Sequence, residues 1–187
     1  ARTGTLVISK SGGTAETLAQ FEITGQVGLV SSAHVHDLYG GAVESALTGA
    51  GCRVTTALVS DGEPAKNLAT VSQLYDTFLE AGLDRTSTLV ALGGGVVGDM
   101  TGFVAATLFR GIPFIQIPTT LLAMVDASIG GKTGVNHPHG KNLIGAVHQP
   151  KAVLIDPDLV KSLPRGELTS AFAEILKAGA IADSGFF

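Results

Sequence analysis

Short apolar runs alternate with longer amphipathic segments through most of this chain. Continuous Val, Leu and Ile runs bounded by turn residues are typical of buried parallel strands, and residues 88–92 (TLVAL) form such a run. The pattern predicts strands over residues 4–9, 27–31, 53–60, 87–92, 114–117 and 152–155, and helices over 37–48, 67–81, 99–109 and 120–126. Strands joined by crossover helices predict an α/β fold, a Rossmann-like doubly wound parallel sheet.

The pattern changes after residue 157. Residues 166–182 predict one long helix, and no strand is expected after it. We therefore expect an α/β domain over residues 1–163 and, over 164–187, the first helix of a second, truncated α-helical domain. The apolar end at 181–187 favours a fragment.

Composition narrows the class of protein. A length of 187 residues predicts one full core, and the 45% hydrophobic content with mean hydropathy of +0.38 predicts a well-buried globular protein. The longest charge-free apolar stretch, 111–125, contains Pro113 and Pro118 and is too short to span a bilayer, so no membrane partner is expected. The start at Ala1 has no signal-peptide pattern and Cys52 is the one cysteine, which favours the cytoplasm.

Charge argues against one partner and points to another. The net charge of −4 argues against nucleic-acid binding. Between Asp126 and Asp156, however, there is no acidic residue, while three lysines and three histidines occur there. This stretch is either a loop that lacks acids by chance or an anion site.

The segment GGGVVGD at residues 93–99 follows a predicted strand and has the G-x-G-x-x-G spacing. Glycines there would let the backbone approach a pyrophosphate at a helix N-terminus, although they could also serve close helix–strand packing. The next predicted strand has no acid to bind a ribose, which departs from an ordinary Rossmann dehydrogenase. The acidic turn at 61–66, with Glu63 and Lys66, could supply ribose contacts or be a solvated helix start.

Residues 126–145 are interpreted as a glycine-rich loop with donors for a phosphorylated or polyhydroxylated ligand, namely Lys132, Lys141 and Asn142. The spacing of a P-loop is absent. Asp126 could hold a substrate hydroxyl or pair with a lysine. We do not expect His137 and His139 to bind a metal, because no third ligand lies near them in sequence.

Five segments together resemble the 3-dehydroquinate synthase family of sugar phosphate cyclases: 93–99, 110–114 (RGIPF), 117–122 (IPTTLL), 126–145 and 173–177 (AEILK). The resemblance covers about residue 60 to the end. It implies an NAD- and metal-dependent lyase of the shikimate pathway, using zinc or cobalt. Its substrate would be a phosphorylated sugar acid, 3-deoxy-D-arabino-heptulosonate 7-phosphate, cyclised to 3-dehydroquinate with elimination of phosphate.

The resemblance also implies residue roles. Cofactor contacts would come from Glu63, Lys66, Gly93, Gly94, Gly95, Val96, Gly98, Asp99, Thr119, Thr120, Lys132 and Lys141. Catalytic and substrate contacts would come from Asp126, Lys132, Asn142 and Lys177, with Arg110 lent across a homodimer interface. Glu174 would be one metal ligand.

One departure limits this expectation. The family's other two metal ligands are histidines of the helical domain, and His137, His139 and His148 do not occupy their places. We therefore expect the chain alone to bind NAD and to lack turnover. Cyclases that make deoxy-inosose or valiolone remain alternatives, as do a more distant glycerol-dehydrogenase-like enzyme and a non-catalytic nucleotide-binding module.

Overall fold

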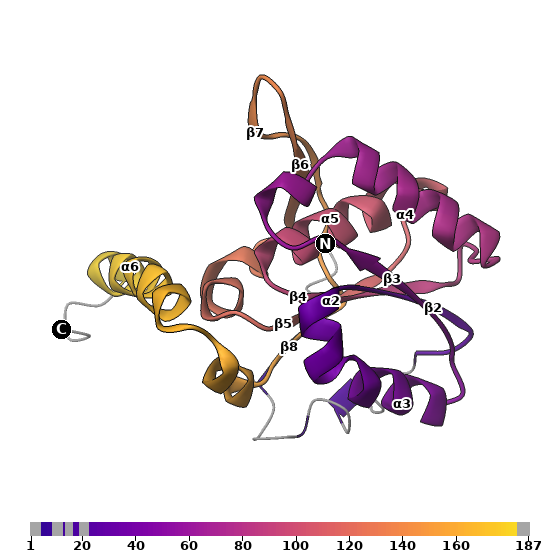
Figure 1. Cartoon of the computed structure of the whole chain (residues 1–187), viewed down its shortest axis with the longest axis horizontal. Helices are drawn as coiled ribbons and strands as arrows, with labels where there is room; N and C mark the ends of the chain where they lie inside the picture. The colour runs from indigo at the N-terminus through magenta and orange to yellow at the C-terminus, as the bar shows by residue number, and fades with distance from the viewer. Residues whose placement is uncertain (1–4, 9–12, 14–16, 19–22, 183–187) are drawn as a thin grey trace.

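A six-stranded parallel sheet forms the centre of the computed structural model, which describes residues 5–8, 13, 17–18 and 23–182 (Figure 1). Its strands in spatial order are β1 (Thr5–Ile8), β8 (Ala152–Ile155), β5 (Phe114–Pro118), β4 (Thr88–Gly93), β2 (Gln26–Ser32) and β3 (Arg53–Val59). All neighbouring pairs are parallel. The six predicted strands are confirmed; the expected ends at residues 4 and 9 lie outside the described residues.

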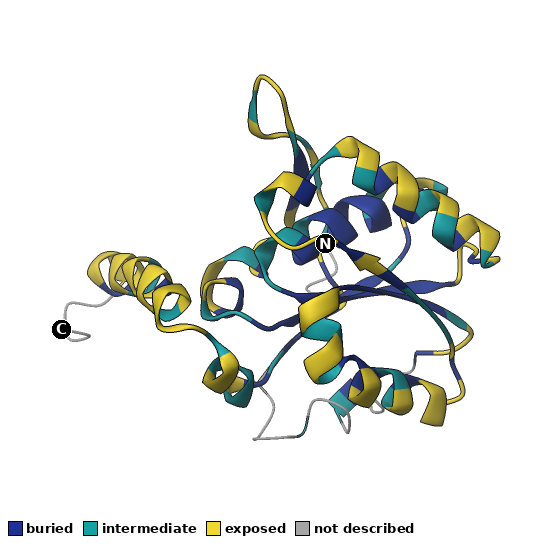
Figure 2. Ribbon diagram, viewed as in Figure 1, coloured by how far each residue is buried: buried dark blue, intermediate teal, exposed yellow. Residues whose placement is uncertain are grey.

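Helices cover both faces of the sheet, so two apolar cores form (Figure 2). Successive side chains of a strand point to opposite faces. Leu89 of β4 packs in the core that includes α4 (Leu68–Glu80) and α5 (Gly95–Thr107), whereas Val90 packs in the core that includes α3 (Gly41–Gly49). The doubly wound architecture is therefore confirmed.

Two helices begin earlier than predicted. The helix expected from residue 37 begins at α2 (Ala33–Val35) and runs through the π-helical segment η1 (His36–Gly40) into α3. The helix expected from residue 99 begins at Gly95, because the glycines there allow close packing. A Cβ at Gly98 would lie 2.7 Å from the Gln116 side chain on β5. Because glycine has a low helix propensity, the sequence predicted a helix start that is too late.

Residues 126–145 are not the loop that their glycines suggested. They contain most of an antiparallel hairpin of β6 (Lys132–His137) and β7 (Gly140–Val147), which projects from the domain (Figure 1). Gly134 and Gly145 face each other across it, and a Cβ on Gly145 would meet the backbone oxygen of Thr133. The glycines thus serve close approach of two strands.

Four short helical segments and one long helix make up the rest of the described fold. Three are 3₁₀ helices, η2 (Glu63–Ala65), η3 (Leu108–Arg110) and η5 (Pro157–Ser162), and η4 (Ala123–Ala127) is a π-helical segment where a helix over 120–126 was expected. The long helix α6 (Arg165–Ala182) was expected, and it lies to one side of the sheet, in contact with η4 (Figure 1). Among the described residues, no helix is both long and apolar enough to cross a membrane.

Candidate functional site

A pocket of about 620 Å³, here called the glycine pocket, opens at the carboxyl ends of β2, β3, β4 and β5. The helix after β4 lies on one face of the sheet and the helix after β2 on the other, so these neighbouring strands form a topological switch point. Ligands of open α/β sheets bind in this crevice. The predicted residues that line it are Glu63, Lys66, Gly94, Gly95, Val96, Asp99, Thr119 and Thr120.

The N-terminus of α5 forms one wall of the glycine pocket. Gly94 is its N-cap and has no side chain to occupy the first backbone N–H groups, which are left free for a ligand. A helix N-terminus with free N–H groups favours an anion such as a pyrophosphate. Thr119 closes the neighbouring wall, and its N–H donates to the Gly93 oxygen at 3.0 Å.

Ser32, at the end of β2, is a lining residue that sequence reasoning missed. Its side chain is 2% exposed, and its hydroxyl is buried with no hydrogen-bond partner in the described structure. An unsatisfied buried hydroxyl is unfavourable, so a ligand that fills the pocket would gain by bonding to it. Its place at the end of the strand beside β4 is the signal that could have identified it.

The acidic turn brings Glu63 against the hairpin. Asn136 donates a hydrogen bond to Glu63 at 2.8 Å and lowers the pKa of this carboxyl below its usual value. Lys66 and Lys141 lower this pKa further, against the effect of partial burial. Glu63 is therefore an anion at neutral pH, with the exposed Lys141 amine 3.8 Å from its carboxylate.

Lys66 joins the glycine pocket to the hairpin. Its side chain is 5% exposed, and its Nζ donates to Asp99 and to the side-chain oxygen of Asn142, each at 2.5 Å. Burial raises the pKa of Asp99 above its usual value, although the Lys66 bond opposes this. Three residues from separate predicted motifs thus form one partly buried polar cluster, with Lys66 buried and Asn142 exposed.

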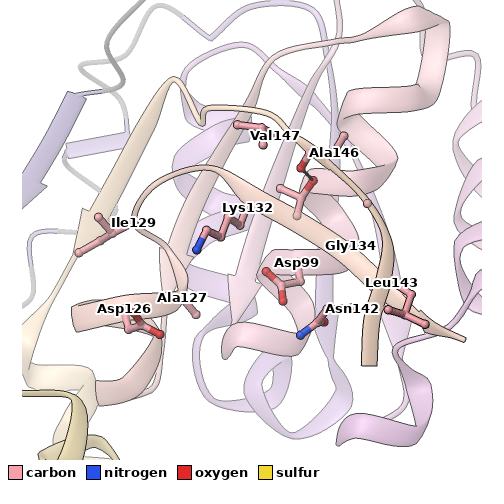
Figure 3. A pocket seen from close by; sticks show the side chains of 12 residues that line it. Asp99, Asp126, Ala127, Ile129, Lys132, Gly134, Asn142, Leu143, Ala146 and Val147 are labelled. Atoms are coloured by element: carbon pink, nitrogen blue, oxygen red, sulfur yellow. Dashed lines mark hydrogen bonds between the residues drawn. The ribbon is translucent and has the colours of Figure 1, made fainter. Parts of the chain in front are cut away.

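A second pocket, the hairpin pocket, lies between α5, η4 and the hairpin and has a volume of about 580 Å³. Figure 3 shows Asp99, Asp126, Lys132 and Asn142 around this cavity. Asp99 lines both pockets, so it is their shared wall. Carboxylates, an amine and an amide around one cavity suit a polyhydroxylated ligand with an anionic group.

Two of the predicted residues lie on α6. Lys177 forms an ion pair with Glu174, and this hydrogen bond raises the pKa of Lys177. Asp126 of η4 also raises that pKa by its charge. Neither Glu174 nor Lys177 lines either pocket.

The described residues do not by themselves make up a complete metal site. They contain no group of three or more His, Cys, Asp or Glu side chains that could hold an ion. His137 and His139 stack on each other at the exposed hairpin tip, and His148 bonds to the Ile112 oxygen. Glu174 is thus a single carboxylate, whereas catalytic zinc sites have three protein ligands.

Arg110 lies outside both pockets. It follows the C-terminal end of α5, about 20 Å from the glycine-pocket end of this 13-residue helix. Phe109 and Arg110 both have left-handed backbones, with φ of 53° and 69°, and Arg110 is exposed. Arg110 therefore does not join the other predicted residues within one chain.

Fold and pockets define a doubly wound α/β domain with a ligand crevice at its switch point. A family model described as 3-dehydroquinate synthase N-terminal matches residues 56–170. The chain belongs to the 3-dehydroquinate synthase family.

Named relatives and one solved structure are similar to this chain over nearly its whole length. The chain is 55% identical over 170 residues to 3-dehydroquinate synthase of Picosynechococcus sp., and 54% identical over 173 residues to that of Synechocystis sp.. These alignments cover 91% and 92% of this chain but 47% and 48% of the relatives, so the chain spans about half their length. A 2-epi-5-epi-valiolone synthase from Streptomyces hygroscopicus, solved with NAD+ and Zn2+ bound, is 32% identical with a TM-score of 0.87, covering 95% of this chain and 49% of that one.

Proposed function

We propose that this chain is the cofactor-binding portion and part of the substrate site of a 3-dehydroquinate synthase. The observation that carries the proposal is the shared wall at Asp99, which sets a crevice for a dinucleotide beside a polar pocket for a sugar acid. Identity of 54–55% to named dehydroquinate synthases, against 32% to the valiolone synthase, favours this reaction over that of the sister cyclase.

The glycine pocket fits NAD. The α5 N-terminus offers free N–H groups to the pyrophosphate, and the Ser32 hydroxyl offers a buried polar contact. Glu63, an anion beside Asn136 and Lys141, can accept from ribose hydroxyls. Bound NAD would supply a hydride acceptor and donor for a substrate hydroxyl.

The hairpin pocket fits the phosphorylated sugar acid. Lys132 offers a cation to its anionic groups, and Asp126 can accept from a hydroxyl. The side-chain oxygen of Asn142 accepts from Lys66, which leaves the side-chain NH₂ group to donate to the substrate. Lys177 of α6 does not line this pocket, and it would add a second cation only if α6 comes closer to the substrate.

Two parts of the proposed reaction, the metal site and the phosphate contact, need groups that one copy of the described residues does not supply. Glu174 would be one ligand of a divalent metal, and the remaining ligands would come from the helical portion of the family. Arg110, turned away from both pockets of its own chain, would reach the substrate phosphate of a partner in a homodimer.

Titration calorimetry with NAD+ tests the cofactor assignment. The chain should bind NAD+, and Gly95→Val should weaken binding by about tenfold or more, equivalent to about 1.4 kcal/mol. A Cβ at Gly95 would already lie 3.1 Å from Ala127 of η4, so valine should displace the first turn of α5, which lines the glycine pocket. Gly49→Val, at a helical glycine with open space around it, is the control. Equal affinity of Gly95→Val and the unaltered chain would refute the assignment.

A complementation assay tests the reaction. The chain mixed with the separately produced C-terminal half of the Picosynechococcus relative should release phosphate from the heptulosonate phosphate, and neither part alone should. If the mixture binds NAD+ but releases no phosphate, the chain is a nucleotide-binding module and not half of this enzyme.

A further inference from the structure

Asn136 lies at the end of β6 and lines neither pocket. Its side chain nevertheless contacts residues of both. The side-chain NH₂ donates to the Glu63 carboxylate at 2.8 Å, and the side-chain oxygen accepts from the backbone N–H of Asn142 at 2.9 Å. One amide side chain therefore bonds to the acidic turn and to β7 at once.

The backbone of Asn136 makes the same connection. Its N–H donates to the Lys66 oxygen at 2.9 Å, and Asn136 pairs with Asn67 in an isolated parallel bridge. The end of β6 is thus hydrogen-bonded to the segment that follows β3. No other described bridge outside the named strands joins the hairpin to the sheet domain.

The bond to Asn142 has a conformational consequence. Asn142 has a φ of 55°, in the left-handed region that glycine adopts freely and asparagine adopts when local hydrogen bonds support it. The bond from its N–H to Asn136 holds it there, and its side chain then accepts from Lys66, which also bonds Asp99. Asn136, Asn142, Lys66 and Asp99 form one continuous polar chain from the turn to the shared wall.

We propose that Asn136 is a positioning residue that sets Glu63 for the dinucleotide and Asn142 for the sugar acid, and so couples the two pockets. The inference rests on the proposed function for the identity of the two ligands. It assigns Asn136 no contact with either ligand. Its effect passes through Glu63 on one side and Asn142 on the other.

Two variants of Asn136 distinguish its bond to Glu63 from its bond to Asn142. Asn136→Ala removes both side-chain bonds, and NAD+ affinity should fall about tenfold because Glu63 loses a bond to its charged form. Asn136→Asp has the same shape and still accepts from Asn142, but it sets a second carboxylate against Glu63. NAD+ affinity should therefore fall at pH 8 as well.

The pH dependence of Asn136→Asp distinguishes positioning from a general loss of structure. Two carboxylates in contact share a proton with a raised pKa. Lys66 and Lys141 flank Glu63, and Asp99 lies beyond Lys66, so these groups also face the pair. At about pH 5 the shared proton should restore the bond, and the variant-to-unaltered affinity ratio should return to within about twofold. The Asn136→Ala ratio should not change with pH.

Amide hydrogen exchange at Asn142 tests the role of Asn136 without any need for NAD+ binding. The Asn142 amide should exchange about tenfold faster in Asn136→Ala than in the unaltered chain, and His139→Ala, at the exposed tip of the same hairpin, should leave it unchanged. If the unaltered chain fails to bind NAD+ but exchange responds as expected, the proposed cofactor is wrong and the role of Asn136 stands. Unchanged Asn142 exchange in Asn136→Ala, or no recovery of Asn136→Asp at low pH in a chain that binds NAD+, would overturn the inference.

Discussion

At the scale of single residues, the paired charges of Lys66 and Asp99 stand out because both are largely buried. Lys66 is 5% exposed and the Asp99 side chain 21%. A buried charge is tolerated only when it is paired, and removal of one partner leaves the other uncompensated. Each charge of the pair therefore depends on the other to be tolerated in the fold.

Lys66→Met should lower the free energy of unfolding by about 2–3 kcal/mol at pH 7.5, because Asp99 then stays buried without its partner. Burial already places the folded-state pKa of Asp99 above its unfolded value. For such a group, stability falls as pH rises from the unfolded pKa through the folded one. Loss of Lys66 raises the folded pKa further, so the deficit of the variant should be larger at the higher of two pH values. Urea unfolding at pH 5.5 and 7.5 measures it.

A double variant supplies the control for this prediction. In Lys66→Met with Asp99→Asn no buried charge remains, so most of the loss at pH 7.5 should be recovered. If Lys66→Met is as stable as the unaltered chain at both pH values, the charge pair has no part in stability.

At the scale of elements, the hairpin lies across α5 because α5 has a glycine where they meet. A Cβ on Gly102 would lie 2.4 Å from the Thr133 methyl group of β6 and 3.1 Å from the Phe114 ring. Thr133 in turn donates to the Ala146 oxygen across the hairpin. The position of the hairpin pocket thus depends on how closely β6 approaches α5.

Gly102→Ala should destabilise the chain by about 1–3 kcal/mol, the usual effect of an added group in a well-packed core. The opposite result is expected for Gly41→Ala, since nothing lies within 4 Å of a Cβ there and alanine favours a helix by about 1 kcal/mol. Thermal unfolding of both variants by circular dichroism compares them. Equal melting temperatures would show that the hairpin can move away from α5 without cost.

The same elements show what the sequence could predict. Apolar runs bounded by turn residues predicted the six strands, most clearly at β4, which is buried along its whole length. The sequence did not predict the hairpin, because Gly134 and Gly145 interrupt its apolar pattern. These glycines allow the two strands to approach closely, which only the fold reveals. The predicted donors do gather around two pockets, yet the bonds from Asn136 and the orphan Ser32 hydroxyl depend on tertiary positions that no spacing encodes.

At the scale of the whole molecule, α6 is set apart from the two cores. Of its side chains, Phe172 and Leu176 are about half exposed and Ile181 is 80% exposed, whereas Ala171 is buried. Its contacts are mainly with η4. Hydrophobic stabilisation scales with the apolar area removed from water, so α6 adds little to the stability of the sheet domain.

The predicted boundary at residue 163 can be tested on that basis. A chain ending at residue 163 keeps the Tyr39–Ser162 hydrogen bond of 2.6 Å and both cores, so its unfolding free energy should lie within about 1 kcal/mol of the longer chain. The urea m-value should change little, because it follows the area exposed on unfolding and α6 is already largely exposed. Amide exchange should agree, with α6 exchanging about a hundredfold faster than β4 in the longer chain. A loss above about 3 kcal/mol would mean that α6 is part of the sheet domain's cooperative unit, and that Glu174 and Lys177 are held in place by the same core that holds the glycine pocket.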